Sequence, residues 1–570
     1  MNTRYIISIA VRVLCLPVIV MSGIQLHAEE MKATQDDTKS IVVEGQLAPR
    51  LQNLGDHKFP VTTDSDRAQL FINQGMNLTY GFNHMEADRS FKEAARLDPD
   101  CAMAYWGMAL ALGPNINLPM SPESEPAAYE LVQKAKSLME GATAREKGLI
   151  EALSARYSGK ESADRSKYDQ AYAEAMKKLH RQYPADLDIA TLYVESVMDL
   201  SPWDYWTRDG KPYPATADMM NLLEAVISKN PNHPGAIHLY IHVVEYGRPQ
   251  LAEAGADRLL KLVPGAGHLV HMPSHIYRRI GRYHDASLSN IAAINADEDY
   301  IVQCRAQGVY PLAYHPHNIH FLWDSSTMEG RSATALDAAR KASSTVPEGI
   351  WHDIPLLHQF LVTPLFAYTR FGKWDEILAE PQPPKESPFW TGIWHYARGL
   401  AYTAKSNMKA AEQELAKLTE IADMKEMEGY QVTFSRNGAK AILDIAVAVL
   451  SGELEAGKGN YEQAIVKLHR GVLLEDNLIY NEPPDWHVPV RQVLGAVLLD
   501  ADRAAEAEAI YWQDLRENPE NGWSLFGLMK SLKVQDKDVE AAAVEERFRK
   551  AWSRADVKLD SSRIFVVSGP

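Results

Sequence analysis

Three histidines stand close together in the stretch GHLVHMPSHIYRRIGRYHDA, namely His268, His271 and His275. Their spacings of three and four residues place the three imidazoles on one face of a helix. Further along the chain, the stretch YHPHNIHFLW adds His317 and His320, again three residues apart. Imidazole is the commonest side-chain metal ligand in proteins, so these residues are the first candidates for a metal centre.

Another pair of histidines lies upstream, His238 and His242, with Glu245 three residues beyond. The spacing H-x3-H suits one first-row metal ion, because Cβ atoms at this spacing on a helix lie roughly 5–6 Å apart. Three or four such nitrogens from two or three helices would bind copper, zinc or iron. Glu245 would then bind the metal or orient one of its ligands. The predicted metal ligands are therefore His238, His242, His268, His271, His275, His317 and His320.

The same histidines have alternative interpretations. A buried imidazole can hydrogen-bond a backbone carbonyl group and serve only the fold. Proton transfer between a histidine and Glu245, without metal, is a further alternative. Ten of the nineteen histidines lie between positions 233 and 320, and this concentration is the reason for treating them as one cluster.

An internal repeat predicts the helices that position these residues. In FINQGMNLTYGFNHMEADRSFKEAARLDPD, a small residue is followed by a pattern of small, aromatic and proline residues: Gly75, Ala87, Phe91, Ala94 and Pro99. Small residues let two antiparallel helices approach, the aromatic ring fills the gap between them, and proline stops the second helix. Weaker versions of this phrase recur along the chain, so the sequence predicts an array of helical hairpins.

The interval between recurrences points to a repeat family. Ala252 and Ala286 hold the same place in successive phrases and are 34 residues apart, which is the tetratricopeptide period. The chain therefore resembles the tetratricopeptide-repeat (TPR) family over roughly residues 68–555. This resemblance implies an all-α fold, a right-handed α-solenoid of TPR-like helical hairpins with a concave groove that holds ligands.

The resemblance also implies that positions 2, 5 and 9 of each first helix line this groove. When the small residue after the turn, Ala286, is numbered 20, its repeat has His268, His271 and His275 at these positions. Two adjacent repeats then direct imidazoles into the same groove, because the register of the next repeat places its histidines at positions 2 and 5.

The upstream pair fits this groove less well. Numbered from Ala252, His238 and His242 fall at positions 6 and 10, turned by about 100° from the groove-lining stripe. A register error of one residue would bring both into the groove.

Other stretches carry weaker indications. SPWDYW offers Trp203, Asp204 and Trp206 as ligand-binding candidates on a loop over the groove, and simple packing of that loop is the alternative. YNEPPDWHVPVR contains Glu482 and Asp485 and is interpreted as a loop between helices. Together with the phrase HMPSHIYRRIGRYHDA, it is similar to a group of exported bacterial TPR proteins, a resemblance that implies no particular activity.

The N-terminus predicts export. Arg4 and Arg12 flank an apolar stretch from Val13 to Ile24, and cleavage after Ala28 would complete a signal peptide. The protein is expected to be periplasmic or secreted. No later stretch has eighteen uninterrupted apolar residues, so no membrane insertion is expected after cleavage.

The rest of the chain divides into predicted segments. A polar N-terminal segment at 29–66 precedes an N-terminal array at 67–378, which carries the histidine-rich groove. A proline-rich connection at 379–390 leads to a C-terminal array at 391–557, followed by the tail at 558–570.

Charge and motifs exclude several function classes. A net charge of -16 argues against nucleic-acid binding. No H-E-x-x-H, P-loop or G-x-S-x-G motif occurs, so common zinc-protease, nucleotide and hydrolase chemistry is not indicated. Cys101 and Cys304 are expected to be buried thiols.

The sequence therefore predicts an exported binding protein whose groove holds a transition metal, a polar small molecule or a peptide. A partner protein is a further possible occupant of the groove. The alternatives are a metal-dependent enzyme that uses the histidine cluster, without any assigned catalytic residue, and a periplasmic protein–protein interaction scaffold.

Overall fold

The computed structural model describes residues 45–161, 164–304 and 310–564. The predicted signal peptide lies outside the described residues. Within them the chain is built from helices joined by short turns and loops, and only isolated β-bridges occur beside these helices.

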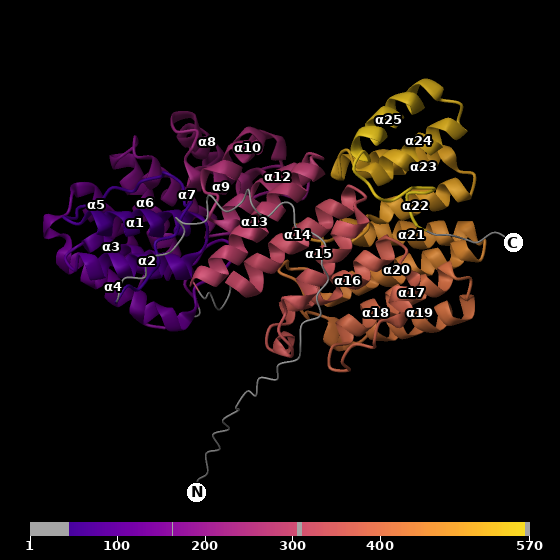
Figure 1. The fold of residues 1–570 in the computed structure, drawn as a ribbon, viewed down its shortest axis with the longest axis horizontal. Coiled ribbons are helices and arrows are strands. Elements are labelled where there is room, and N and C mark those ends of the chain that lie inside the picture. Colours follow the sequence, from indigo (N-terminus) through magenta and orange to yellow (C-terminus); the bar gives the residue numbers. More distant parts are fainter. Residues whose placement is uncertain (1–44, 162–163, 305–309, 565–570) are drawn as a thin grey trace, which may run out of the picture. The chain divides into compact units, whose positions relative to one another are not determined.

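The helices follow one another along the chain as in Figure 1. Those before position 305 are α1 (Asp66–Tyr80), α2 (His84–Leu97), α3 (Ala102–Ala111), α4 (Glu125–Leu138), α5 (Ala144–Ser154), α6 (Ser166–Gln182), α7 (Leu187–Met198), α8 (Pro214–Lys229), α9 (Pro234–Val244), α10 (Glu253–Leu262), α11 (Gly267–His271), α12 (Pro273–Arg279) and α13 (Tyr283–Cys304). Those after it are α14 (His315–Met328), α15 (Ser332–Ser344), α16 (His358–Arg370), α17 (Trp374–Ala379), α18 (Pro388–Ala404), α19 (Met408–Ala422), α20 (Ala439–Gly457), α21 (Tyr461–Asp476), α22 (Val490–Asp500), α23 (Ala504–Glu517), α24 (Gly522–Val534) and α25 (Asp538–Ala551).

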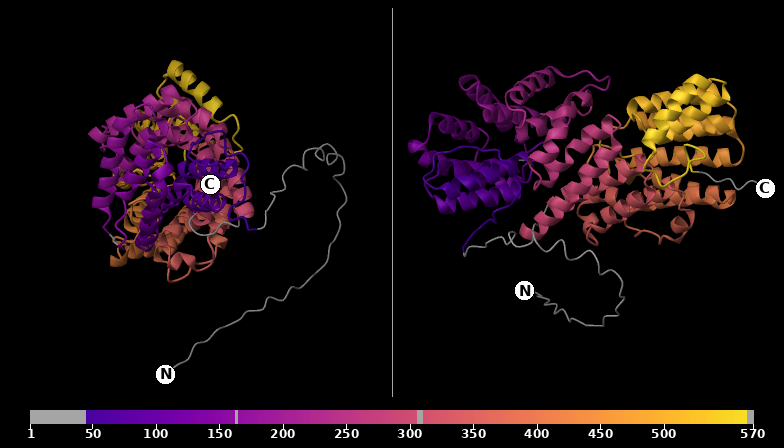
Figure 2. Two further views of the ribbon diagram at one scale, coloured as in Figure 1. Left: turned by 90° about the vertical axis from the view of Figure 1, so that its left-hand side faces the viewer. Right: turned by 45° about the horizontal axis from the view of Figure 1, so that its top comes forward.

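Consecutive helices pack as hairpins, for example α1 with α2, α14 with α15, and α20 with α21. Figure 2 shows the array of helices from two further directions. Successive hairpins also touch, as α2 does α3 and α21 does α22. The described chain is thus an all-α solenoid of TPR-like helical hairpins.

Small residues are required where the predicted pattern places them. A Cβ atom on Gly75 or Gly107 would lie 2.6 or 2.4 Å from the ring of Phe91. Gly527 faces Tyr511 in the same way, with a contact of 2.1 Å. The aromatic ring of one helix therefore occupies the space that glycine leaves on its neighbours, which confirms the predicted packing.

The apolar core consists of two clusters of buried side chains. One extends from Ala48 to Tyr314 and the other from Ile294 to Leu559, so they change over around α13 and α14. The proline-rich connection lies between α17 and α18, which both contribute to the second cluster. The division into two arrays at 379–390 stays a prediction.

Residues 45–65 form an extended segment that packs against the helices. Phe59 in this segment is fully buried, and the Gly265 amide donates a hydrogen bond to the carbonyl oxygen of Asn53 over 2.8 Å. Cys101 and Cys304 are buried free thiols, as predicted. None of the described helices has the length and apolar character needed to span a membrane.

Candidate metal centre

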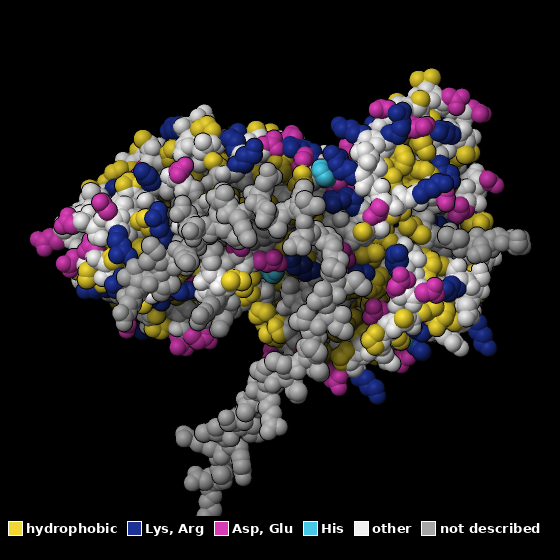
Figure 3. Space-filling model, in the orientation of Figure 1, with side chains coloured by type: hydrophobic (Ala, Val, Ile, Leu, Met, Phe, Trp, Pro, Cys, Tyr) yellow, Lys and Arg dark blue, Asp and Glu magenta, His cyan; other side chains and the backbone are white. Residues whose placement is uncertain are grey.

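Six of the seven predicted histidine ligands come together in two groups of three. We call the group formed by His238, His242 and His268 the first triad, and the group formed by His271, His275 and His317 the second triad. Within each triad, one ring nitrogen from every histidine lies within 4.8 Å of the other two. Little histidine is visible on the face of the molecule in Figure 3, in keeping with the burial of these side chains.

The histidines of both triads occupy equivalent positions on their helices. Counted from the first residue of α9, His238 and His242 are fifth and ninth. His271 and His275 are likewise fifth and ninth from the start of α11, the last of them in α12 after a break before Pro273. In each triad the third imidazole comes from the next first helix, namely α11 for the first triad and α14 for the second.

A phenylalanine ring also touches every member of each triad. The centroid of Phe82 lies 4.4–6.0 Å from the three ring centroids of the first triad. The centroid of Phe321 lies 4.6–5.1 Å from those of the second. Each group of nitrogens therefore faces an apolar wall, which limits the room for water.

Hydrogen bonds fix the tautomers of two of these histidines. Nδ1 of His238 lies 2.6 Å from the carbonyl oxygen of Tyr80, which can only accept. Nδ1 of His271 lies 2.7 Å from Oδ1 of Asn290. The amide nitrogen of Asn290 is committed to the carbonyl of Ala286, so its Oδ1 accepts as well. Both imidazoles therefore carry hydrogen on Nδ1, and Nε2 has a free lone pair.

The third tautomer follows from a carboxylate. Nδ1 of His275 lies 2.8 Å from Oε2 of Glu482 and 3.2 Å from Oε2 of Glu245. When Glu482 is ionised, Nδ1 of His275 donates the hydrogen, which leaves a lone pair on Nε2 of His275, and this atom lies 3.0 Å from Nε2 of His271. Two lone pairs that face each other at this distance repel unless a cation lies between them. With metal–nitrogen bonds of about 2.0–2.1 Å, they would subtend roughly 90–97° at a metal ion, as two adjacent ligands do.

Burial keeps these imidazoles neutral. It lowers the pKa of His238 to about 3 and that of His271 to about 4. Burial, reinforced by neighbouring imidazoles, also lowers the pKa values of His242, His268 and His275 well below the ordinary value. Both ring nitrogens of His242 and of His268 are buried without a hydrogen-bond partner. A neutral imidazole with a free lone pair is the form that binds a metal ion.

Two buried carboxylates lie behind these rings. Oε1 of Glu245 is 3.6 Å from Nδ1 of His242, so Glu245 stands between the two triads. Burial and the adjacent charge of Glu482 raise the pKa of Glu245 well above its ordinary value. Burial also raises the pKa of Glu482 to about 7, although Arg278 opposes the change. Glu482 further accepts a hydrogen bond of 2.5 Å from the hydroxyl of Tyr480.

Glu482 is a residue beside the second triad that the sequence interpretation left out of the candidate ligands. It belongs to the loop between α21 and α22, 207 residues after His275. The only indication in the sequence is an acidic residue in a proline-rich loop, which is common without any such role.

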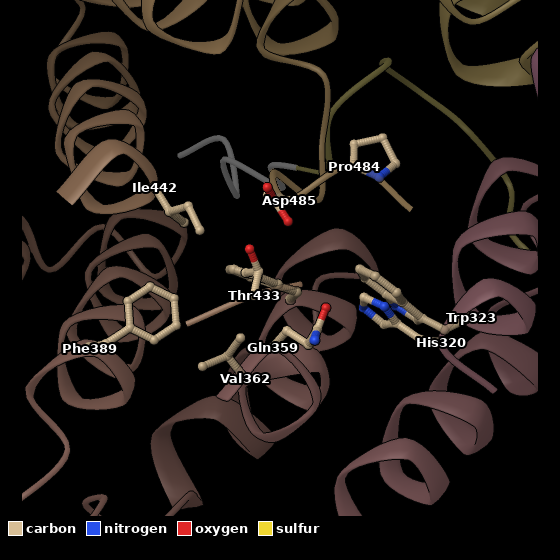
Figure 4. Close-up of a pocket in the computed structure, with 10 residues that line it drawn as sticks. His320, Trp323, Gln359, Val362, Phe389, Thr433, Ile442, Pro484 and Asp485 are labelled. Atoms are coloured by element: carbon tan, nitrogen blue, oxygen red, sulfur yellow. The ribbon is translucent and has the colours of Figure 1, made fainter. Parts of the chain in front are cut away.

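The seventh predicted ligand, His320, lies outside both triads. Its ring stacks on Trp323 at 4.8 Å and 11°. The two side chains line a separate small cavity with Gln359, Thr433 and Asp485 (Figure 4). A separation of three residues turns His320 by about 60° around α14 from the direction of His317, and this side faces α16 instead of α12.

The predicted loop 201–206 contributes one contact. Trp203 is 42% exposed, and the edge of its ring meets His242 at a centroid distance of 5.0 Å. Asp204 is exposed and belongs to neither triad. Trp206 is buried and donates from Nε1 to the carbonyl oxygen of Val243 over 2.6 Å, a packing role.

A further group, His57, Asp188 and His233, also has metal-ligand spacing. Nδ1 of His233 accepts a hydrogen bond from the amide of Ala236, so the ring hydrogen sits on Nε2, which points to Asp188 at 3.3 Å. Asp188 also accepts hydrogen bonds from His57 and from the hydroxyl of Tyr80. Since Nε2 of His233 has no free lone pair, this group is a hydrogen-bond network and not a metal site.

Comparisons with known proteins add little to this geometry. No protein-family model and no curated protein sequence matches the chain. Several solved structures are similar over much of their length. The Cut9–Hcn1 hetero-tetramer of the APC/C is 12% identical over 85% of this chain and 76% of that chain, with a TM-score of 0.31.

Two other structures have similar scores. The human IFIT1 dimer with m7Gppp-AAAA is 12% identical over 86% of this chain and 91% of its own, with a TM-score of 0.30. Yeast Tom70 is 12% identical over 85% and 91%, with a TM-score of 0.31. Likeness at this level carries no functional argument. The assignment of a TPR-like solenoid rests on the chain's own helix pairing and glycine–aromatic contacts.

Proposed function

We propose that this protein binds a transition metal, copper, zinc or iron, at the buried imidazoles of the two triads. The observation that carries the proposal is the pair of Nε2 atoms of His271 and His275, 3.0 Å apart. Each of these histidines is held by a hydrogen bond at Nδ1, the arrangement that metal-ligating histidines almost always have.

Unpartnered imidazoles support the same conclusion. A buried polar group without a hydrogen bond costs about 1–3 kcal/mol. Nε2 of His238 and all ring nitrogens of His242 and His268 are in this state. A metal ion would bind one nitrogen of each and turn this cost into coordination energy.

A metal-free alternative accounts for part of the geometry. If Glu482 were protonated, it would donate to Nδ1 of His275, and Nε2 of His275 would then donate to His271. This proton-bridged arrangement removes the conflict between the two lone pairs. It leaves His242 and His268 without any partner, so the metal proposal explains more of the buried polar atoms.

Metal analysis of the purified full chain tests the proposal. After treatment with a chelator, the protein is loaded with Zn(II) or Cu(II), dialysed and assayed for bound metal. Stoichiometric metal is expected, and the H271A/H275A double variant should lose at least part of it. His358, a buried histidine with both ring nitrogens hydrogen-bonded, provides the matched control H358A, which should keep its metal. A natively folded protein that binds no metal refutes the proposal.

The N-terminal sequence supports a second part of this proposal, that the protein works in an exported compartment. Fractionation of cells that express the full chain would locate it. Recovery with the periplasmic or secreted fraction, shortened by the first 28 residues, is expected. Recovery of the unshortened chain with the cytoplasmic fraction refutes this part and leaves the metal proposal intact.

A further inference from the structure

The histidine donors among the described residues separate into two groups of three instead of one group of six. Within each group the ligand nitrogens lie within 4.8 Å of one another. An ion bound by the three imidazoles of one triad leaves the imidazoles of the other triad without a metal. We propose that the centre holds two metal ions, one in each triad, and that a small exogenous ligand binds between them. This inference rests on the proposed metal-binding function.

The two triads have the same ligands in the same arrangement, so each could form a metal site of the same kind. Each combines an H-x3-H pair on one first helix with a single histidine from the next, and each has one phenylalanine against all three rings. Three imidazoles are also a complete protein ligand set for an ion that keeps one coordination position open. Neither triad needs a ligand from the other to reach this number.

The two sites adjoin each other. The ring centroids of His268 and His271 are 5.9 Å apart, and those of His242 and His275 are 5.8 Å apart. Two of the three histidines of the first triad therefore lie beside histidines of the second triad. Two ions this close repel each other, and they would also favour the ionised form of the buried Glu245 and Glu482, whose negative charge then offsets the repulsion.

The chemistry of the donors favours copper. All six proposed ligands are imidazoles, Glu482 is hydrogen-bonded to Nδ1 of His275, and Glu245 lies 3.6 Å from Nδ1 of His242. Sites that prefer divalent iron or manganese usually include carboxylate ligands, whereas an all-nitrogen site follows the order of affinity that peaks at Cu(II).

The surroundings restrict the bridging ligand to a small one. Five of the six histidines are at most 3% exposed, and only His317 is partly open to solvent. Phe82 and Phe321 close the apolar walls. The class of ligand that fits is a diatomic molecule or a small anion, for which azide is a convenient probe.

Copper loading of the full chain tests this inference. Two Cu(II) ions per chain are expected, with an electron paramagnetic resonance signal well below two full spins because adjacent ions couple. H268A should remove the first site and H317A the second, each leaving one ion with a full one-spin signal. Azide should bind the native protein at one per two copper ions and produce an absorption band that both variants lose.

The outcomes separate the two proposals. A protein that binds neither copper nor zinc refutes metal binding altogether, and one that binds zinc but no copper refutes the copper pair alone. One ion per chain refutes the pair and leaves metal binding standing. Two ions that give two full spins show that the sites are not adjacent, which overturns the bridging ligand. If H268A or H317A does not fold, stepwise loading of the native protein decides, because one full spin should appear up to the first equivalent and diminish up to the second.

Discussion

In the E482Q variant, which lacks the carboxyl group with a pKa of about 7, metal affinity at the histidine centre should be almost independent of pH between 7 and 5. Only a neutral imidazole binds a metal ion, so protonation competes with binding. Burial lowers the pKa of His271 to about 4 and that of His238 to about 3. Both side chains are therefore still neutral at pH 5. The other four ligands have pKa values well below the ordinary one and should behave alike.

The magnitude follows from these pKa values. For an exposed histidine with an ordinary pKa of about 6.5, the change from pH 7 to pH 5 weakens binding about 25-fold, and for three together about 10⁴-fold. A histidine with a pKa of about 4, as at His271, loses only about a tenth of its affinity. A triad of such residues should change by less than about twofold. The sign is the same in both cases, because acid can only weaken binding.

Isothermal titration calorimetry of the E482Q variant with Zn(II) at pH 7 and pH 5 measures this difference. An unfolded peptide with the sequence of α9, which carries an exposed H-x3-H pair, is the control and should lose most of its affinity. A loss of three or more orders of magnitude in the folded variant would show that the imidazoles titrate as exposed groups, and the buried centre would then be refuted.

Three further predictions concern single residues. Replacing Glu482 by Gln removes the charge from the hydrogen bond to Nδ1 of its histidine partner and should weaken metal binding about 10–100-fold with native circular dichroism; unchanged affinity would deny the carboxylate an orienting role. W203A should accelerate metal loss with little change in melting temperature, because Trp203 is 42% exposed. W206A should instead lower the free energy of unfolding by about 3–5 kcal/mol, because Trp206 is buried. G527A should lower the melting temperature, because the added Cβ would lie 2.1 Å from a tyrosine ring. The control G141A should leave it unchanged, because no atom lies within 4 Å of that Cβ position. Equal shifts in the two variants would refute the packing argument.

The fold was predictable because it depends on local contacts. In a helical solenoid each hairpin packs mainly on its neighbours, so a short pattern of small and aromatic residues carries most of the information. Gly75 and Phe91 illustrate this, since they are close in sequence and touch in the structure. The shared face of His268, His271, His275 and His317 followed from the same periodicity, whereas His320, predicted for the same groove, lies outside both triads.

The position of His238 and His242 shows that numbering a repeat only from the small residue after its turn can misplace a side chain by one residue. Ala252 and Ala286 are 34 residues apart, but His238 and His271 are 33 apart. The connection after α9 contains a 3-10 turn, Pro249–Ala252, and this changes its length by one residue relative to the next repeat. Numbered from the helix starts, both H-x3-H pairs coincide, so helix starts are the better landmark for the groove.

Contacts between distant parts of the chain could not be predicted from the sequence. Phe82 reaches the first triad from the turn between α1 and α2, and Glu482 reaches the second from beyond α21. Neither has a fixed spacing from the histidines. Their positions depend on the path of the whole array, which no local pattern specifies.

The contact between His275 and Glu482 leads to a final prediction. Metal binding should slow hydrogen exchange in the C-terminal half of the chain. In a solenoid with neighbour contacts only, an ion held by α9 to α14 would not affect residues after α21. Here the loop that carries Glu482 contacts His275 of the second triad, and the ring of Tyr480 also packs against Tyr246 at 4.9 Å. A metal ion on Nε2 of His275 makes its Nδ1–H a stronger donor, which should hold this loop more firmly.

Hydrogen exchange of the metal-free and metal-loaded protein measures this coupling. Amides of residues 478–482 should exchange more slowly after loading, in addition to those of α9, α11 and α12. In the E482Q variant loaded to the same occupancy, the protection near the histidines should persist and that of the loop should diminish. Equal loop protection in both proteins would mean that the loop responds to general tightening of the fold. The carboxylate would then not connect the two halves, and their connection would have to come from other contacts, such as the packing of Tyr480 on Tyr246 and the hydrogen bonds from Arg208 to Asn477.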